Sequence, residues 1–203
     1  MSERSPCRVA SIALAVACVM SGCAESGPSS GERPASSSLS GPRAGTTVAP
    51  PRRPAGPVAR GWQVVDVVDG DTVTVERSGR RLTVRLIGID TPETVDPSRP
   101  VECFGPEATA FAQRRLAGAR VWLEFDPSQG RRDVYGRTLA YVWPERPSGG
   151  RSLFNLRAVR RGYAVEFTYD RDYRWRDAFR DAELRAAATQ VGLWSPSTCG
   201  GSA

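Results

Sequence analysis

Residues 62–89 alternate apolar and polar side chains with a period of two, and this alternation constrains the fold more than any other feature. Residues 64–68, 72–76 and 82–89 have the composition and spacing of strands. Asp-Gly and Ser-Gly pairs, which are typical of tight turns, separate them. The pattern predicts three consecutive strands joined by hairpins.

The order of the later elements extends this prediction to a whole domain. Apolar residues recur at helical spacing over 106–116, where Pro106 and Glu107 suit a first turn. Two more strands are expected over 120–125 and 138–143, with a polar loop at 126–135 between them. Helices are expected over 152–162 and from 172 to about 190. This order predicts a β-rich α+β fold, a small closed Greek-key barrel of five strands with three helices.

The N-terminus has the pattern of an export signal. Arg4 and Arg8 precede an apolar run over residues 9–20, which is shorter than the roughly 20 residues that a membrane-spanning helix needs. We therefore expect a signal peptide over residues 1–22. Ser21 and Gly22 stand directly before Cys23, an arrangement that resembles the lipobox of bacterial lipoproteins and implies a lipid on that thiol. Plain secretion with cleavage nearby stays open, because Met20 is less usual than leucine at its position.

Residues 23–60 are rich in Ser, Gly and Pro and contain almost no large apolar side chain, so we expect a disordered tether. A folded domain over 61–196 and a C-terminal tail over 197–203 follow. Cys7 and Cys18 leave with the signal peptide and Cys23 would carry lipid, which leaves Cys103 and Cys199 as one pair. An oxidising compartment favours a disulfide between them, with two free thiols as the alternative.

The charged residues narrow the possible chemistry. The chain contains no histidine, which excludes an imidazole triad base, a histidine zinc site and a histidine proton shuttle. Every basic side chain is arginine, and the net charge is +6. Guanidinium groups match phosphate oxygens in pairs, so phosphate-bearing partners are one explanation. The other explanation for the exclusive use of arginine is a genome biased toward GC-rich codons.

Two acidic motifs suggest a metal site. Alone, Asp69-Gly70-Asp71 is a tight turn, and the segment from Asp90 to Glu93 is a turn or cap. Together, they place Asp71 at the start of one predicted strand and Asp90 at the end of another, so both carboxylates can meet at one rim of a small barrel. Carboxylate and carbonyl oxygens suit calcium or magnesium.

Three further residues complete a pattern suited to phosphodiester hydrolysis. Glu93 lies near the predicted metal and could take a proton from water. Arg85 and Arg137 could stabilise the negative charge of the transition state. The alternatives are an ion pair on the barrel wall for Arg85 and a solvated side chain for Arg137.

Four ordered motifs, at residues 67–72, 85–94, 105–111 and 133–141, resemble the staphylococcal nuclease (thermonuclease) family. The resemblance extends over about residues 62–195. It implies an OB-fold barrel and a calcium-dependent nuclease that acts on DNA and RNA. It also implies cleavage of the bond to the 5′ oxygen, which leaves 3′-phosphate ends.

The same resemblance assigns site roles. The implied calcium ligands are Asp71, Asp90 and the Thr91 carbonyl; the implied phosphate-binding pair is Arg85 and Arg137; and the residue that activates or orients water is Glu93. Tyr135 and Tyr169 correspond to tyrosines of the nucleotide pocket, although residues 166–169 align only loosely. The lysines that flank this pocket in the best-known member are absent.

The expectation is therefore an exported monomeric nuclease that prefers single-stranded substrates and is either lipid-anchored at Cys23 on the outer face of the membrane or secreted. One alternative is a catalytically weak nucleic-acid-binding lipoprotein, which the complete set of acids and arginines disfavours. Another is a glycosidase with two carboxylates. That alternative leaves Arg85 and Arg137 unexplained.

Overall fold

The computed structural model describes residues 61–94, 97–98, 100–145 and 152–202. The predicted signal peptide, the tether and the proposed lipid site at Cys23 lie outside the described residues. Within the part of the chain that is described, none of the helices has the length and apolar character needed to cross a membrane.

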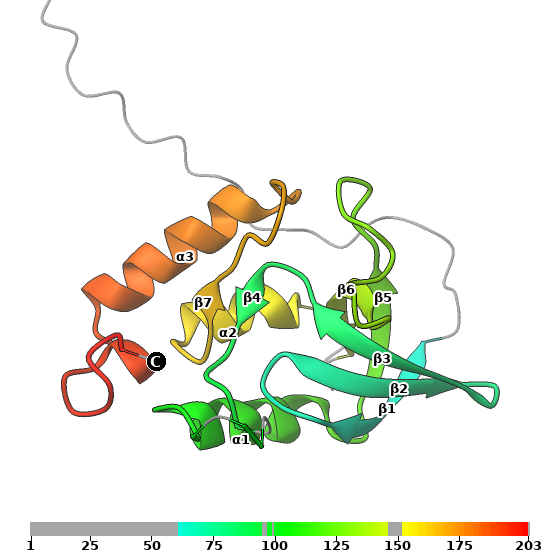
Figure 1. The fold of residues 1–203 in the computed structure, drawn as a ribbon, viewed down its shortest axis with the longest axis horizontal. Helices are drawn as coiled ribbons and strands as arrows, with labels where there is room; N and C mark the ends of the chain where they lie inside the picture. Colours follow the sequence, from blue (N-terminus) through cyan, green and yellow to red (C-terminus); the bar gives the residue numbers. More distant parts are fainter. Residues whose placement is uncertain (1–60, 95–96, 99, 146–151, 203) are drawn as a thin grey trace, which may run out of the picture. The chain divides into compact units, whose positions relative to one another are not determined.

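Five strands form a closed barrel, as predicted (Figure 1). In order around the barrel they are β1 (Trp62–Val67), β2 (Thr72–Arg77), β3 (Arg80–Leu86), β6 (Thr138–Pro144) and β5 (Arg120–Glu124). The pair β3–β6 is parallel and the others are antiparallel. Alternate residues of these strands point inward, so Val75, Val84 and Val121 are fully buried in a common core.

Three helices accompany the barrel, also as predicted: α1 (Gly105–Leu116), α2 (Phe154–Arg160) and α3 (Arg176–Ala188). A short 3-10 helix, η1 (Gly192–Trp194), follows α3. The helices α2 and α3 are shorter than predicted at both ends. Gly162 and Gln190 have left-handed φ angles of 66° and 52°, and this conformation does not continue a helix.

The prediction of one strand over residues 82–89 is wrong. The strand β3 ends at Leu86, and Gly88 turns the chain with a φ of 80°. Beyond the turn, β4 (Ile89–Asp90) pairs with β7 (Val165–Glu166) in a separate two-stranded sheet. A Cβ atom at Gly88 would lie 2.6 Å from the Tyr173 ring, so only glycine fits here. The break takes Asp90 out of the barrel wall.

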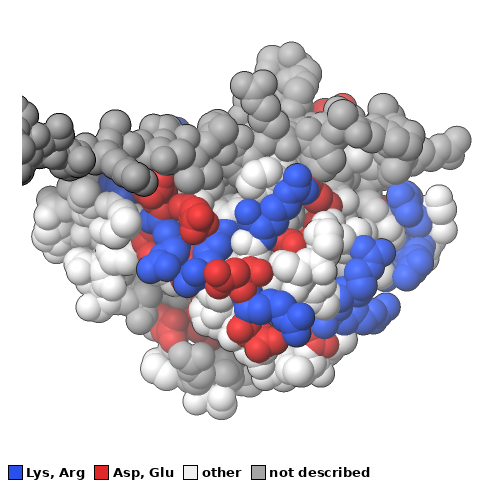
Figure 2. Space-filling model, turned by 90° about the horizontal axis from the view of Figure 1, so that it is seen from above, with Lys and Arg blue, Asp and Glu red and all other residues white. Residues whose placement is uncertain are grey.

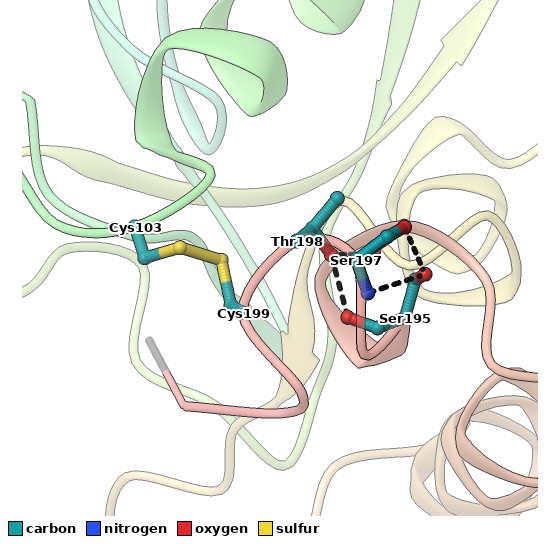
Figure 3. Close-up of a disulfide and its surroundings, with 6 residues drawn as sticks. Cys103, Ser195, Ser197, Thr198 and Cys199 are labelled. Carbon is teal, nitrogen blue, oxygen red and sulfur yellow. Dashed lines mark hydrogen bonds between the residues drawn. A yellow bond between two sulfur atoms is a disulfide. The ribbon is translucent and has the colours of Figure 1, made fainter. Parts of the chain in front are cut away.

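A disulfide fastens the end of the chain to the segment before α1 (Figure 3). Cys103 and Cys199 are 96 residues apart in sequence, with Cα atoms 6.0 Å apart. Beside the disulfide, the Thr198 hydroxyl donates to the Gly192 carbonyl at 2.6 Å and the Ser195 carbonyl at 2.9 Å. Closing so long a loop stabilises the folded state by about 4.7 kcal/mol in the chain-entropy description.

Candidate active site

Arg85 lies at the centre of the site. Its Nη1 is 2.9 Å from Asp71 Oδ2 and its Nη2 is 2.6 Å from Asp90 Oδ1. Nη1 also donates to the Ile89 carbonyl at 2.8 Å. The arginine comes from β3, Asp71 precedes β2 and Asp90 belongs to β4. One guanidinium therefore joins three segments and brings the two predicted carboxylates together.

Asp71 is the buried partner of this group. Its Oδ1 accepts from the Thr72 hydroxyl at 2.9 Å, and its Oδ2 accepts from the Thr91 N–H at 3.0 Å and the Thr91 hydroxyl at 3.2 Å. Burial raises the pKa of the Asp71 carboxyl to about 7, and the Arg85 guanidinium opposes that rise. Its ionised form consequently depends on nearby positive charge. Asp69 Oδ1 accepts the Asp71 N–H at 2.9 Å, which suits the turn role expected for Asp69.

Two buried polar residues hold the turn between β3 and β4. The Asn155 side chain accepts the Val142 N–H at 3.0 Å and donates to the Ile87 carbonyl at 2.9 Å. The Tyr173 hydroxyl donates to the Gly88 carbonyl at 3.3 Å. Neither residue was predicted from the sequence to support the site. The only signal for Asn155 is an amide within the apolar stretch from Phe154 to Leu156.

Glu93 follows β4, on a segment fixed by Glu102. Glu102 Oε2 accepts the Glu93 N–H at 2.8 Å, and the Glu102 N–H donates to the Glu93 carbonyl at 2.9 Å. Glu93 Oε1 accepts the Thr94 N–H at 2.7 Å. Glu102 was not predicted as a site residue, because nothing in the local sequence pattern indicates a partner nine residues away.

Arg137 lies one residue before β6, outside the hydrogen-bonded group around Arg85. Its Nε is 2.6 Å from Asp133 Oδ2. The Asp133 Oδ1 accepts from the backbone N–H of Tyr135 at 3.0 Å and of Arg137 at 2.8 Å. The Arg137 guanidinium lies 5.2 Å from the centre of the Tyr135 ring, and Tyr135 is 81% exposed.

Strand register places Arg137 and Arg85 on one face. Leu139 of β6 pairs with Arg85 of β3, and Arg137 is two residues before Leu139. Side chains two positions apart on a strand point to the same side, and because Arg137 directly precedes β6 we expect it to share the outer face of the barrel with Arg85. Arg85 lies in β3 and Arg137 directly before the neighbouring strand β6, and each has its own acidic partner.

Tyr169 lies two residues beyond Phe167, on the segment that follows β7. It is 78% exposed, and its ring centre is 6.3 Å from that of Phe167. The Phe167 N–H donates to the Gly88 carbonyl at 3.2 Å, which fixes this segment beside β4. Both predicted substrate-binding tyrosines are therefore solvent-exposed rings.

The residues offer hard oxygen donors for a cation. Among the described residues, no group of three or more His, Cys, Asp or Glu side chains is close enough to hold a metal ion. However, the Asp71 and Asp90 carboxylates reach the same guanidinium, and the Asp90 side chain is 48% exposed. Two oxygen ligands with room for water suit calcium or magnesium and do not suit zinc. Figure 2, which views the molecule from above Figure 1, shows arginines and acids interspersed on that face.

A closed five-stranded barrel followed by helices, with acids and arginines gathered at one edge, defines an OB-fold protein of the α+β class. Residues 83–196 match the family described as staphylococcal nuclease homologue. The chain is 38% identical over 134 residues to a thermonuclease of Staphylococcus hyicus, covering 66% of this chain and 75% of that protein.

The chain is also similar to two other nucleases. A thermonuclease of Staphylococcus intermedius is 39% identical over 133 residues, covering 66% of this chain and 75% of that protein. Endonuclease YncB of Bacillus subtilis is 35% identical over 130 residues, covering 64% of this chain and 59% of that protein. The chain belongs to the staphylococcal nuclease family.

Proposed function

We propose that the chain is an exported, calcium-dependent nuclease that hydrolyses phosphodiester bonds in DNA and RNA. Membership of its family makes it a hydrolase of the nuclease class. The observation that carries the proposal is Arg85, whose guanidinium is held between the carboxylates of Asp71 and Asp90. The proposed cation-binding carboxylates and the proposed phosphate-binding guanidinium thus lie in contact at one site.

Asp71, Asp90 and the backbone carbonyl of Thr91 would hold the ion. Calcium bound there supplies positive charge that stabilises negative charge developing on phosphate oxygens. The hydrogen bonds from Thr91 and Thr72 orient the Asp71 carboxylate, so its direction is set before any ion binds.

The side chains of the two arginines and of Glu93 would act on the phosphate and on the attacking water. Arg85 and Arg137 lie on the same face and would bind non-bridging oxygens, whose negative charge grows as the nucleophile attacks. Glu93 would accept a proton from the attacking water or orient it. The P–O5′ bond then breaks, and the 5′ oxygen takes up a proton from solvent and leaves as the 5′-hydroxyl of the next nucleotide, which leaves a 3′-phosphate end, as the family resemblance implies.

Substrate strands would lie across the exposed aromatic rings. Tyr135 and Tyr169 are both more than three-quarters exposed, so a base can stack on either ring. Stacking requires unpaired bases, which supports a preference for single-stranded substrate. We propose that the enzyme acts as a monomer.

The decisive experiment measures acid-soluble nucleotides released from denatured DNA by the purified protein. Calcium is expected to support release and a chelator to abolish it, with activity restored by excess calcium. Tight DNA binding with no release in calcium would contradict the enzyme proposal and favour the nucleic-acid-binding alternative.

We also propose that the protein is exported and anchored through a lipid at Cys23, with plain secretion as the alternative. A disulfide between Cys103 and Cys199 suits an oxidising compartment. Substituting Cys23→Ala is expected to move the full chain from the membrane fraction to the medium. Unchanged fractionation would rule out the anchor.

A further inference from the structure

Arg131 is a positively charged side chain that the proposed mechanism leaves unused. It lies in the loop between β5 and β6, and its guanidinium is 3.7 Å from the centre of the Phe125 ring. Within the described residues its guanidinium forms no ion pair with a carboxylate. The neighbouring Arg132, in contrast, donates to the Gly136 carbonyl at 3.0 Å. Arg131 is therefore an exposed side chain whose guanidinium stacks on an aromatic ring.

Backbone pairing puts Arg131 on the same face as the proposed phosphate-binding residues. Arg132 bridges Thr138 in antiparallel fashion, and the Leu139 N–H donates to the Arg131 carbonyl at 3.1 Å. Arg131 therefore lies opposite Leu139, which pairs on its other side with Arg85. Residues directly opposite one another share a face. The three residues Arg85, Leu139 and Arg131 therefore form a row across neighbouring backbone segments, which are about 4.8 Å apart.

The two ends of this row point in different directions. Arg85 contacts Asp71, which precedes β2, whereas Arg131 lies on Phe125, which directly follows β5. The strands β2 and β5 lie on opposite sides of the β3–β6 pair in the barrel. The two guanidinium groups are consequently directed away from each other and are suited to different phosphates of one strand.

The loop that carries Arg131 is fixed at its base. The buried Asp126 carboxylate accepts from the Tyr141 hydroxyl at 2.6 Å and from the Arg174 N–H at 2.8 Å. The Gln129 side chain donates to the Arg171 carbonyl at 3.0 Å. This anchoring limits the entropy lost when Arg131 binds an anion. The loop projects at the top of Figure 1.

We propose that Arg131, supported by Phe125, is a second phosphate subsite. It binds a phosphate of the substrate strand other than the one held by Arg85 and Arg137, and Leu139 lies between the two subsites. The inference rests on the proposed nuclease function. It assigns a role in affinity for polynucleotides, so Arg131 takes no part in the chemical step.

The test compares Arg131→Ala with Arg114→Ala in the full chain. Arg114 is an exposed arginine in the last turn of α1, at the bottom of Figure 1, so its removal changes the net charge equally. Binding of a fluorescent single-stranded hexanucleotide is measured by anisotropy in chelator, where no cleavage is expected. Arg131→Ala should raise Kd about fivefold and lower the slope of log Kd against log salt by about 0.7, the effect of one phosphate contact. Arg131→Lys should recover most of the affinity.

A second measurement uses cleavage in calcium. Arg131→Ala should raise KM for the hexanucleotide about fivefold and leave kcat/KM for a dinucleotide, which has one phosphodiester, unchanged. Equal Kd values for the Arg131→Ala and Arg114→Ala variants, or an equal loss on both substrates, would overturn the subsite. A wild-type protein that cleaves neither substrate would contradict the nuclease proposal, while the anisotropy measurement would still decide the role of Arg131.

Discussion

Replacing Glu93 with glutamine is expected to lower kcat by about 10²- to 10⁴-fold, the usual contribution of a general base. Glutamine keeps the size of the side chain, and its Oε1 can still accept the Thr94 N–H that Glu93 Oε1 accepts at 2.7 Å. It cannot take up a proton from water. The loop should therefore keep its conformation while proton transfer is lost. The measurement is kcat on denatured DNA with saturating calcium, together with the melting temperature.

Glu102→Gln is the matched control for this variant. It also removes one carboxylate, but glutamine can still accept the Glu93 N–H that Glu102 accepts at 2.8 Å. Near wild-type turnover is expected. If Glu93→Gln retained a kcat within threefold of the wild type, Glu93 would be a structural residue of its loop and the proposed proton transfer would be wrong.

The barrel could be predicted from sequence because its signals are local. Alternation over residues 62–89 and turn pairs such as Ser78-Gly79 identify hairpin strands without knowledge of the rest of the chain. That Asp71 and Asp90 come together was also predicted, but from the expectation that Asp90 ends a barrel strand, whereas it belongs to β4 outside the barrel. In the structure the two carboxylates come together with Arg85 between them.

What could not be predicted depends on contacts between distant segments. The break after Leu86 follows from the close approach of Tyr173 to Gly88, 85 residues apart in sequence. Before that contact is known, residues 82–89 read as one continuous apolar strand. The support of Glu93 by Glu102 likewise crosses a loop. The alternation and spacing of apolar residues describe one helix or strand at a time, so they do not predict contacts between distant elements.

Arg85→Gln and Arg137→Gln are expected to lower kcat/KM alike but to differ in stability. Each variant removes one positive charge that would stabilise the phosphate in the transition state. We therefore expect kcat/KM to fall about 10²- to 10³-fold. Arg85 and its partner Asp71 have side chains only 14% and 7% exposed. Removing the arginine leaves a buried carboxylate without its cation, which lowers the free energy of unfolding by about 3 kcal/mol. Arg137 is 32% exposed, and a pair of this kind contributes about 0 to 1 kcal/mol.

The small cost at Arg137 has a second reason. Asp133 keeps two backbone donors, the N–H groups of Tyr135 and Arg137, when the guanidinium is gone. Urea unfolding in chelator separates stability from activity, and kcat/KM is measured in calcium well below the unfolding midpoint. Equal losses of stability in both variants would mean that the Arg85–Asp71 contact is not a buried ion pair in solution. Full activity in either variant would remove that arginine from the proposed phosphate-binding pair, because a charge that contacts the transition state cannot be replaced by a neutral amide without loss of rate.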